Sequence, residues 1–197
     1  MSNRSERRRQ IEKRKQQQIL VSVLIGLGVI VALVGVFASL AKTASNIPQG
    51  GYSTIPAEVN YPAPDLALES VAGGTEALTD YRDKVVLVNN WATWCPPCKA
   101  EMPTLAAYYK AHADEGFMIV AVEAGEPLDQ VKAFADQYQL PFSVWLDPDG
   151  KALQAFQNGT LPNSYVIDRT GTVRLMWTGE ITRDMLEKYV TPLLGEG

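Results

Sequence analysis

The stretch Trp-Cys-Pro-Pro-Cys at residues 94–98 contains Cys95 and Cys98, the only two cysteines of the chain. Residues 85–88 before it are continuously apolar, as in a buried strand, and residues 96–113 after it have the composition of a helix. A Cys-x-x-Cys pair where a strand turns into a helix is typical of redox-active dithiols. At a helix N-terminus, unpaired amides and the helix dipole stabilise the thiolate that carries out disulfide exchange.

Two other uses of the cysteines compete with this interpretation. A zinc site needs further soft ligands, and besides the two cysteines the chain offers only His112. A structural disulfide would rarely join residues this close, with Pro96 and Pro97 stiffening the turn between them. We therefore favour a redox-active pair and expect no metal and no cofactor other than the Cys95–Cys98 disulfide itself.

The N-terminal part predicts a membrane anchor. Residues 1–18 carry seven basic and two acidic side chains, and residues 19–41 carry no charge. As a helix with a rise of about 1.5 Å per residue, the uncharged run would extend roughly 34 Å, enough to cross a bilayer core. Basic residues that flank a membrane span remain on the cytoplasmic side. We therefore expect a cytoplasmic tail at 1–18, an anchor at 19–41 and the rest of the chain outside the cytoplasm. Cleavage after residue 41 as a signal peptide is the alternative, although the run exceeds the usual length of about 7–15 residues.

The remainder divides into a linker and one domain. Residues 42–62 are rich in proline and glycine and predict a linker. Residues 63–197 have an ordinary domain length, and we expect a monomer. The net charge of the chain is -4, with the acidic excess outside the tail, which argues against nucleic acid as a partner.

Within the domain, hydrophobic runs and turn signals predict alternating strands and helices. The expected strands cover residues 65–70, 85–90, 117–122, 142–146, 164–167 and 173–177. The expected helical segments are 78–81, 96–113, 128–138 and a last helix, capped by Thr182, that ends near residue 194. The β–α–β–α–β order predicts an α/β fold with parallel central strands and helices on both faces, and the turn at Gly171 adds an antiparallel pair.

Residues 89–103, 120–123 and 161–165 resemble segments of a known family. Their sequences, NNWATWCPPCKAEMP, VAVE and LPNSY, are similar to those of extracytoplasmic thioredoxin-like thiol–disulfide oxidoreductases of the TlpA, ResA and CcmG type. The resemblance covers residue 63 to the end of the chain. It implies a thioredoxin fold with an added N-terminal hairpin and a central insert, which residues 128–146 fit. It also implies a membrane-tethered protein outside the cytoplasm, in agreement with the predicted anchor.

The resemblance and the helical spacing together assign the two thiols. We expect Cys95 to be exposed at the helix start and to attack the substrate disulfide. Cys98 lies on an apolar stripe of the helix and is expected to be more buried, as the thiol that resolves the mixed disulfide.

Three polar residues near the dithiol follow from the same resemblance. Glu101, one turn after Cys98 and expected on the helix surface, is the candidate for proton transfer; the alternative is an ordinary solvated carboxylate. Asn89 takes the place of a buried aspartate of cytoplasmic thioredoxins and cannot titrate. Asn90 departs from the family, in which an apolar residue is usual, and suggests a wetter site or an altered partner surface. Two further residues, Glu123 and Glu126, match polar loop positions, which we interpret as structural.

Substrate binding is assigned to residues on both sides of the dithiol. In the family a cis-proline faces the dithiol, and its neighbouring backbone pairs with the substrate chain. Leu161 and Pro162 fit this position, although a trans-proline at the start of a strand is the alternative. Trp94 is expected to cover the thiols and contribute to docking, together with Pro96 and Pro97.

The sequence therefore predicts a membrane-anchored thiol–disulfide oxidoreductase that reduces protein disulfides outside the cytoplasm. The resemblance implies apocytochrome c before haem attachment as a substrate, and a membrane thiol–electron donor, because glutathione and thioredoxin act inside. A thiol peroxidase on the same fold is an alternative, but it needs a cysteine in a different loop context. A copper or haem chaperone is another, but a copper site would need a distant histidine, and His112 lies on the active-site helix itself. A general oxidant of thiols is the remaining alternative, which only the redox potential can exclude.

Overall fold

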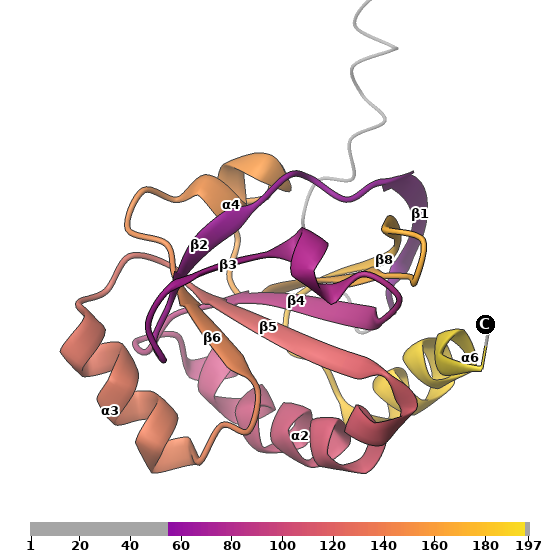
Figure 1. Ribbon diagram of the computed structural model, residues 1–197. Helices are drawn as coiled ribbons and strands as arrows, with labels where there is room; N and C mark the ends of the chain where they lie inside the picture. The colour runs from indigo at the N-terminus through magenta and orange to yellow at the C-terminus, as the bar shows by residue number, and fades with distance from the viewer. Residues whose placement is uncertain (1–54, 196–197) are drawn as a thin grey trace, which may run out of the picture. The chain divides into compact units, whose positions relative to one another are not determined.

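The structure, a computed structural model, describes residues 55–195, so the predicted tail and anchor and most of the predicted linker lie outside the described residues. Within them, one mixed sheet has the strand order β1-β8-β7-β4-β5-β6-β2-β3 (Figure 1). The strands are β1 (Ala57–Pro62), β2 (Ala67–Ser70), β3 (Thr75–Ala77), β4 (Val85–Trp91), β5 (Phe117–Glu123), β6 (Ser143–Leu146), β7 (Asn163–Ile167) and β8 (Thr172–Thr178).

Helices cover both faces of this sheet. They are η1 (Leu78–Tyr81), α2 (Pro96–His112), η2 (Ala113–Glu115), α3 (Leu128–Tyr138), α4 (Lys151–Ala155), and a C-terminal run of α5 (Arg183–Met185), η3 (Leu186–Val190) and α6 (Thr191–Leu194). One core lies between the sheet and α2, α3 and the C-terminal run. A second core on the opposite face includes residues of η1 and α4. This arrangement confirms the predicted thioredoxin-like α/β fold with a mixed sheet.

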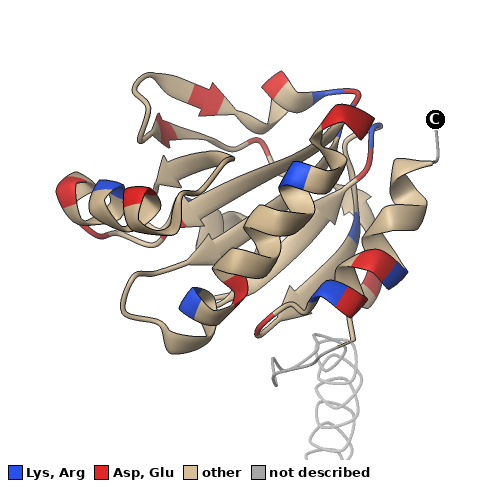
Figure 2. Ribbon diagram, turned by 90° about the horizontal axis from the view of Figure 1, so that it is seen from below, with Lys and Arg blue, Asp and Glu red and all other residues tan. Residues whose placement is uncertain are grey.

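Strand β4 leads into the active site and is buried along its whole length. It pairs in parallel with β5 and antiparallel with β7, and β5 pairs in parallel with β6. A strand covered on both faces needs apolar residues at almost every position, which is why the run at residues 85–88 does not alternate. In β4, β5 and β7 the only charged residue is Glu123, and charged residues gather on the helices and turns (Figure 2).

The predicted linker is wrong at its C-terminal end, because β1 occupies residues 57–62 and pairs antiparallel with β8. Val59 and Tyr61 are half-buried against the second core, which gives the segment its period of two. Pro62, at the end of the strand, is one of the prolines that favoured a linker, but an edge strand tolerates proline. The second unpredicted strand, β3, has three residues and completes the N-terminal hairpin with β2.

The last helix is correctly placed but not continuous. Thr182 is the N-cap residue, as predicted, but its side chain makes no capping bond; its carbonyl accepts from the amides of Met185 and Leu186. A π-helical stretch, η3, separates α5 from α6. Pro192 has no amide to donate and falls near the start of α6, where a proline is tolerated.

Glu76, in the N-terminal hairpin, links that hairpin to strand β6. It accepts hydrogen bonds from the hydroxyl of Tyr81, from Ser143 Oγ at 2.7 Å and from Trp145 Nε1 at 2.9 Å. Burial alone would raise the pKa of Glu76, but these bonds outweigh it and lower the pKa to about 2. We expect Glu76→Ala to lower the free energy of unfolding at pH 7 by about 2–3 kcal/mol, measured by urea denaturation.

The same bonds give this contribution a defined pH dependence. A carboxylate with a depressed pKa stabilises the fold above its ordinary value of 4.5 and loses that contribution as the pH falls toward about 2. The isosteric variant Glu76→Gln should therefore lose less stability on acidification over this interval than the wild type does. Parallel acid profiles for the two proteins would show that the ionised carboxylate contributes nothing.

Candidate active site

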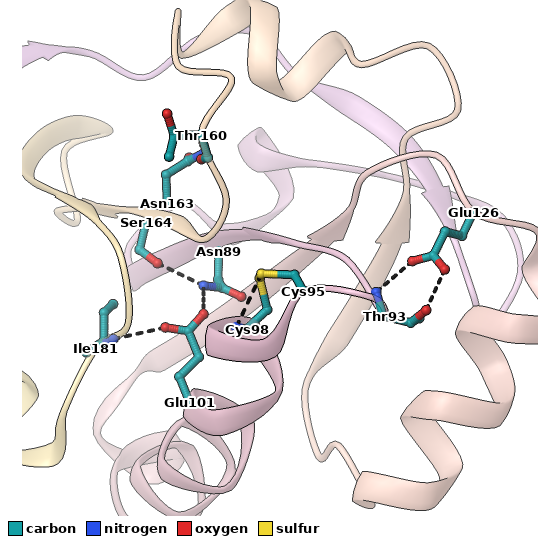
Figure 3. Close-up of a disulfide and its surroundings, with 10 residues drawn as sticks. All are labelled: Asn89, Thr93, Cys95, Cys98, Glu101, Glu126, Thr160, Asn163, Ser164 and Ile181. Carbon is teal, nitrogen blue, oxygen red and sulfur yellow. Dashed lines mark hydrogen bonds between the residues drawn. A yellow bond between two sulfur atoms is a disulfide. The ribbon is translucent and has the colours of Figure 1, made fainter. Parts of the chain in front are cut away.

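Cys95 and Cys98 form a disulfide at the start of α2 (Figure 3), with their Cα atoms 5.3 Å apart. Cys95 is the N-cap residue of the helix, and its Sγ accepts a hydrogen bond from the amide of Cys98 at 3.4 Å. The predicted placement of Cys95 at a helix N-terminus is therefore confirmed. After reduction, the same amide and the helix dipole favour a thiolate on Cys95.

Cys95 is more buried than expected. Its exposed fraction is 3% and that of Cys98 is 0%, so the order of burial is as predicted but Cys95 is not exposed in this oxidised form. Trp94, by contrast, is 66% exposed. Pro96 is exposed and Pro97 half-buried in the first turn of α2, where a missing amide hydrogen costs no helical bond.

Glu101 is fully buried, so its expected place on the helix surface is wrong. Its Oε1 accepts from Asn89 Nδ2 at 2.8 Å, and its Oε2 accepts from the amide of Ile181 at 3.0 Å. Burial outweighs these bonds and raises the pKa of Glu101 to about 8. The side of α2 that carries Glu101 is covered by β4 and by the segment before α5, as Figure 3 shows.

Asn89 fixes the orientation of this carboxyl group. Its Nδ2 also donates to Ser164 Oγ at 2.9 Å, so one amide links β4 with α2 and with β7. A carboxyl group held by two donors and titrating near pH 8 can exchange a proton with a thiol, because efficient transfer needs groups of similar pKa and an ordinary thiol has a pKa of about 8.5. The sequence located both residues but did not indicate that they touch.

Leu161 and Pro162 directly precede β7, the strand that begins beside the dithiol end of β4. The Leu161–Pro162 peptide bond is cis, as the resemblance implied. Because β7 runs antiparallel to β4, its first residue lies beside the end of β4 that leads to Cys95. Leu161 is half-buried and packs against the core cluster that contains both cysteines. The carbonyl of Pro162 accepts from the amide of Gly179 at 2.8 Å.

Two acidic residues support the loop before Cys95. The carboxylate of Glu126 accepts from the amide of Thr93 at 2.6 Å and from its hydroxyl, and the amide of Glu126 donates to Glu123 Oε2 at 2.9 Å. Burial raises the pKa of Glu123, whereas the bonds from Thr93 outweigh burial and lower the pKa of Glu126. Both residues are structural in this sense. Within residues 55–195, no three His, Cys, Asp or Glu side chains gather as metal ligands.

Asn90 does not lie on the surface, so the expected altered partner surface is wrong. It is 1% exposed, and its Nδ2 donates to Asn163 Oδ1 at 2.7 Å. Sequence spacing could not suggest this pair, because the two residues lie on different strands 73 positions apart.

Comparisons with known proteins agree with the site. The model of the AhpC/TSA family matches residues 59–176. The thiol–disulfide oxidoreductase ResA of Geobacillus thermodenitrificans is 33% identical over 178 residues, which are 90% of this chain and 97% of the relative. ResA of Bacillus subtilis is 38% identical over 128 residues, 65% of this chain and 72% of the relative.

Solved structures give the same result. A putative thiol:disulfide interchange protein DsbE from Chlorobium tepidum has a TM-score of 0.65 and 30% identity, covering 71% of this chain and 99% of that one. A secreted thiol–disulfide isomerase from Corynebacterium glutamicum, at 20% identity, a TM-score of 0.67, and coverage of 75% and 94%, supports the fold alone. The chain belongs to the AhpC/TSA family and, within it, to the thioredoxin-like thiol–disulfide oxidoreductases of the ResA type, with Cys95 and Cys98 as its cysteine pair.

Proposed function

We propose that this thiol–disulfide oxidoreductase is a single-pass membrane protein that reduces protein disulfides outside the cytoplasm. The basic tail at residues 1–18 and the uncharged run at 19–41 support this placement. Among residues 55–195, no helix is both long and apolar enough to cross a membrane. The proposed anchor is the uncharged run at residues 19–41, which lies outside the described part.

The buried carboxyl group of Glu101 is the observation that carries the proposed exchange mechanism, and the reductive direction is proposed from the family resemblance. In a reductant, the Cys95 thiolate attacks a substrate sulfur, a bond forms between Cys95 and the substrate, and one substrate thiolate leaves. The Cys98 thiol must then lose its proton before it can attack Cys95 Sγ. Glu101, one turn along the same helix and with a pKa of about 8, is suited to accept it. The second substrate thiolate leaves, and two electrons have passed from the dithiol to the substrate.

The substrate and the electron donor are proposed from the family resemblance. Apocytochrome c needs its cysteines reduced before haem attaches, and the TlpA, ResA and CcmG type implies this substrate. Because the cytoplasmic thiol pools do not reach the outer side, the oxidised dithiol must be reduced again by a thiol carrier within the membrane. A monomer is sufficient for each of these steps.

Reduction of insulin tests the direction of exchange. We expect the full-length protein to accelerate cleavage of the insulin interchain disulfides by dithiothreitol, and Cys95→Ser to reduce the rate to that of dithiothreitol alone. An equal rate for both proteins would contradict the proposed reductase activity.

Labelling tests the proposed location. The chain contains no cysteines besides the active-site pair, so a membrane-impermeant maleimide reports on the dithiol alone. After brief reduction, spheroplasts should show labelled Cys95 in the membrane fraction. Labelling only after lysis would place the dithiol in the cytoplasm and contradict the proposal.

A further inference from the structure

We propose that Asn163, held in place by Asn90, is a positioning residue that fixes the Leu161–Pro162 segment and thereby sets the affinity for polypeptide substrates. This inference rests on the proposed function only in assigning that segment to substrate binding. It applies to exchange in either direction.

The amide group of Asn163 holds the chain that leads to Leu161. Its Nδ2 donates to the carbonyl of Thr160 at 2.7 Å and to the carbonyl of Asn158 at 3.4 Å. In Figure 3, Thr160 and Asn163 lie next to each other, beside the strand that carries Asn89. Asn163, which follows Pro162, therefore bonds to the backbone of Thr160, which precedes Leu161. The Leu161–Pro162 segment is thus held at both of its ends.

The oxygen of the same side chain ties this loop to the strand of the dithiol. Asn163 Oδ1 accepts from Asn90 Nδ2 at 2.7 Å, and the two residues face each other in the pairing of β4 with β7. The exposed fractions are 0% for Asn163 and 1% for Asn90. The Nδ2 and the Oδ1 of Asn163 both make hydrogen bonds to protein atoms, and the side chain is buried. Its amide group therefore has a single orientation, which fixes the Leu161–Pro162 segment relative to β4.

A second amide strengthens the loop but does not connect it to β4. Asn158 Oδ1 accepts from the amide of Thr160 at 3.0 Å, and Asn158 Nδ2 donates to Thr178 Oγ1 at 3.1 Å. Thr178 lies opposite Asn163 in the pairing of β7 with β8, and its hydroxyl accepts a hydrogen bond from Asn158, not from Asn163. It provides a matched control, because its loss removes one hydrogen bond of the cluster and leaves the link to β4 intact.

The pair acts on binding and not on the thiols. Successive side chains of a strand point to opposite faces, and both Asn89 and Ser164 face α2, where Asn89 contacts Glu101. Asn90 and Asn163 therefore face the other side of the sheet, away from α2 and Glu101. Their effect on exchange must pass through the backbone at Leu161 and Pro162, which separates their role from that of Glu101.

Steady-state reduction of a peptide that contains one disulfide, catalysed by the full-length protein with dithiothreitol re-reducing Cys95 and Cys98, tests this role. We expect Asn163→Thr to raise KM about tenfold, since it removes the hydrogen bonds that hold the carbonyls of Thr160 and Asn158, and to change kcat less than twofold. The pH midpoint of Cys95 alkylation should stay at its wild-type value. The control variant Thr178→Val should keep KM within twofold of the wild type.

A second variant keeps the test decisive if Asn163→Thr does not fold, as judged by near-ultraviolet circular dichroism. Asn90→Val removes the donor that orients Asn163 and should raise KM at least threefold. An unchanged KM in a folded Asn90→Val or Asn163→Thr protein would overturn the inference. So would an equal rise in Thr178→Val, or a shifted alkylation midpoint in Asn163→Thr. If the wild type only oxidises the peptide, the proposed reductive direction fails, while the KM ratios measured in that direction still test Asn163.

Discussion

Replacing Cys98 by serine will leave the protein covalently joined to its substrates through Cys95. Cys95 forms the mixed disulfide, and Cys98, three residues on, is the thiol positioned to break it. An intramolecular nucleophile held in place can act as if present at about 10⁵ M or more, so millimolar external thiols cannot replace it. Adducts should accumulate in cells and be visible on non-reducing gels, and mass spectrometry of the trapped partners would identify the substrates.

The reverse replacement is the matched control for this trap. Cys98 has no exposed surface, whereas Cys95 retains a little. Cys95→Ser should therefore give few or no adducts, because the remaining thiol cannot reach a protein disulfide. Equal adduct formation by the two variants would contradict the assignment of Cys95 as the attacking thiol. Recovery of apocytochrome c among the Cys98→Ser adducts would support the proposed substrate.

The variant Glu101→Gln is expected to slow resolution of the mixed disulfide by about 10²-fold, at the lower end of what general base catalysis contributes. Glutamine has nearly the same shape but cannot accept the proton of Cys98. In the wild type, resolution should accelerate as the pH rises through the pKa of Glu101, about 8, and this dependence should be absent from the variant. Single-turnover kinetics of a preformed Cys95–peptide disulfide would measure both. Identical rates and pH profiles would remove Glu101 from the mechanism.

Glu101 also leaves a signature in the stability of the oxidised protein. Its folded-state pKa is raised from the ordinary 4.5 to about 8, so its contribution is fully present below 4.5 and is lost as the pH rises through 8. At 1.36 kcal/mol per pKa unit, the wild type should lose about 4–5 kcal/mol over this interval because of this group alone. Glu101→Gln should show a flatter profile in urea denaturation at pH 5 and pH 8.5. Equal losses in the two proteins would mean that Glu101 titrates normally.

The sequence was sufficient for the features that depend on local pattern. The dithiol at a helix N-terminus follows from one short stretch, and strand β4 follows from its continuous apolar run. Helix α3 has the predicted bounds, Leu128–Tyr138, because its apolar residues recur with helical spacing. The cis bond before Pro162 needed the family resemblance, since most such bonds are trans.

What the sequence did not reveal depends on contacts between distant segments. Glu101 is buried because the amide of Ile181, 80 positions away, covers it, and no spacing within α2 indicates this. The polar character of Asn90 was visible, but its explanation lies in Asn163 on a neighbouring strand. Strand β1 forms at the sheet edge from a segment whose prolines suggested a linker.

The proposed activity depends on Cys95 being a nucleophilic thiolate at a helix N-terminus and on Cys98 being its buried partner. Alkylation of the reduced full-length protein with iodoacetamide at a series of pH values, with each modified cysteine located by mass spectrometry, tests these properties most directly. We predict that Cys95 reacts rapidly at pH 7, where an ordinary thiol with a pKa of about 8.5 is mostly protonated, and that Cys98 reacts far more slowly. Two cysteines that are equally unreactive at pH 7, or a faster reaction of Cys98, would contradict this account.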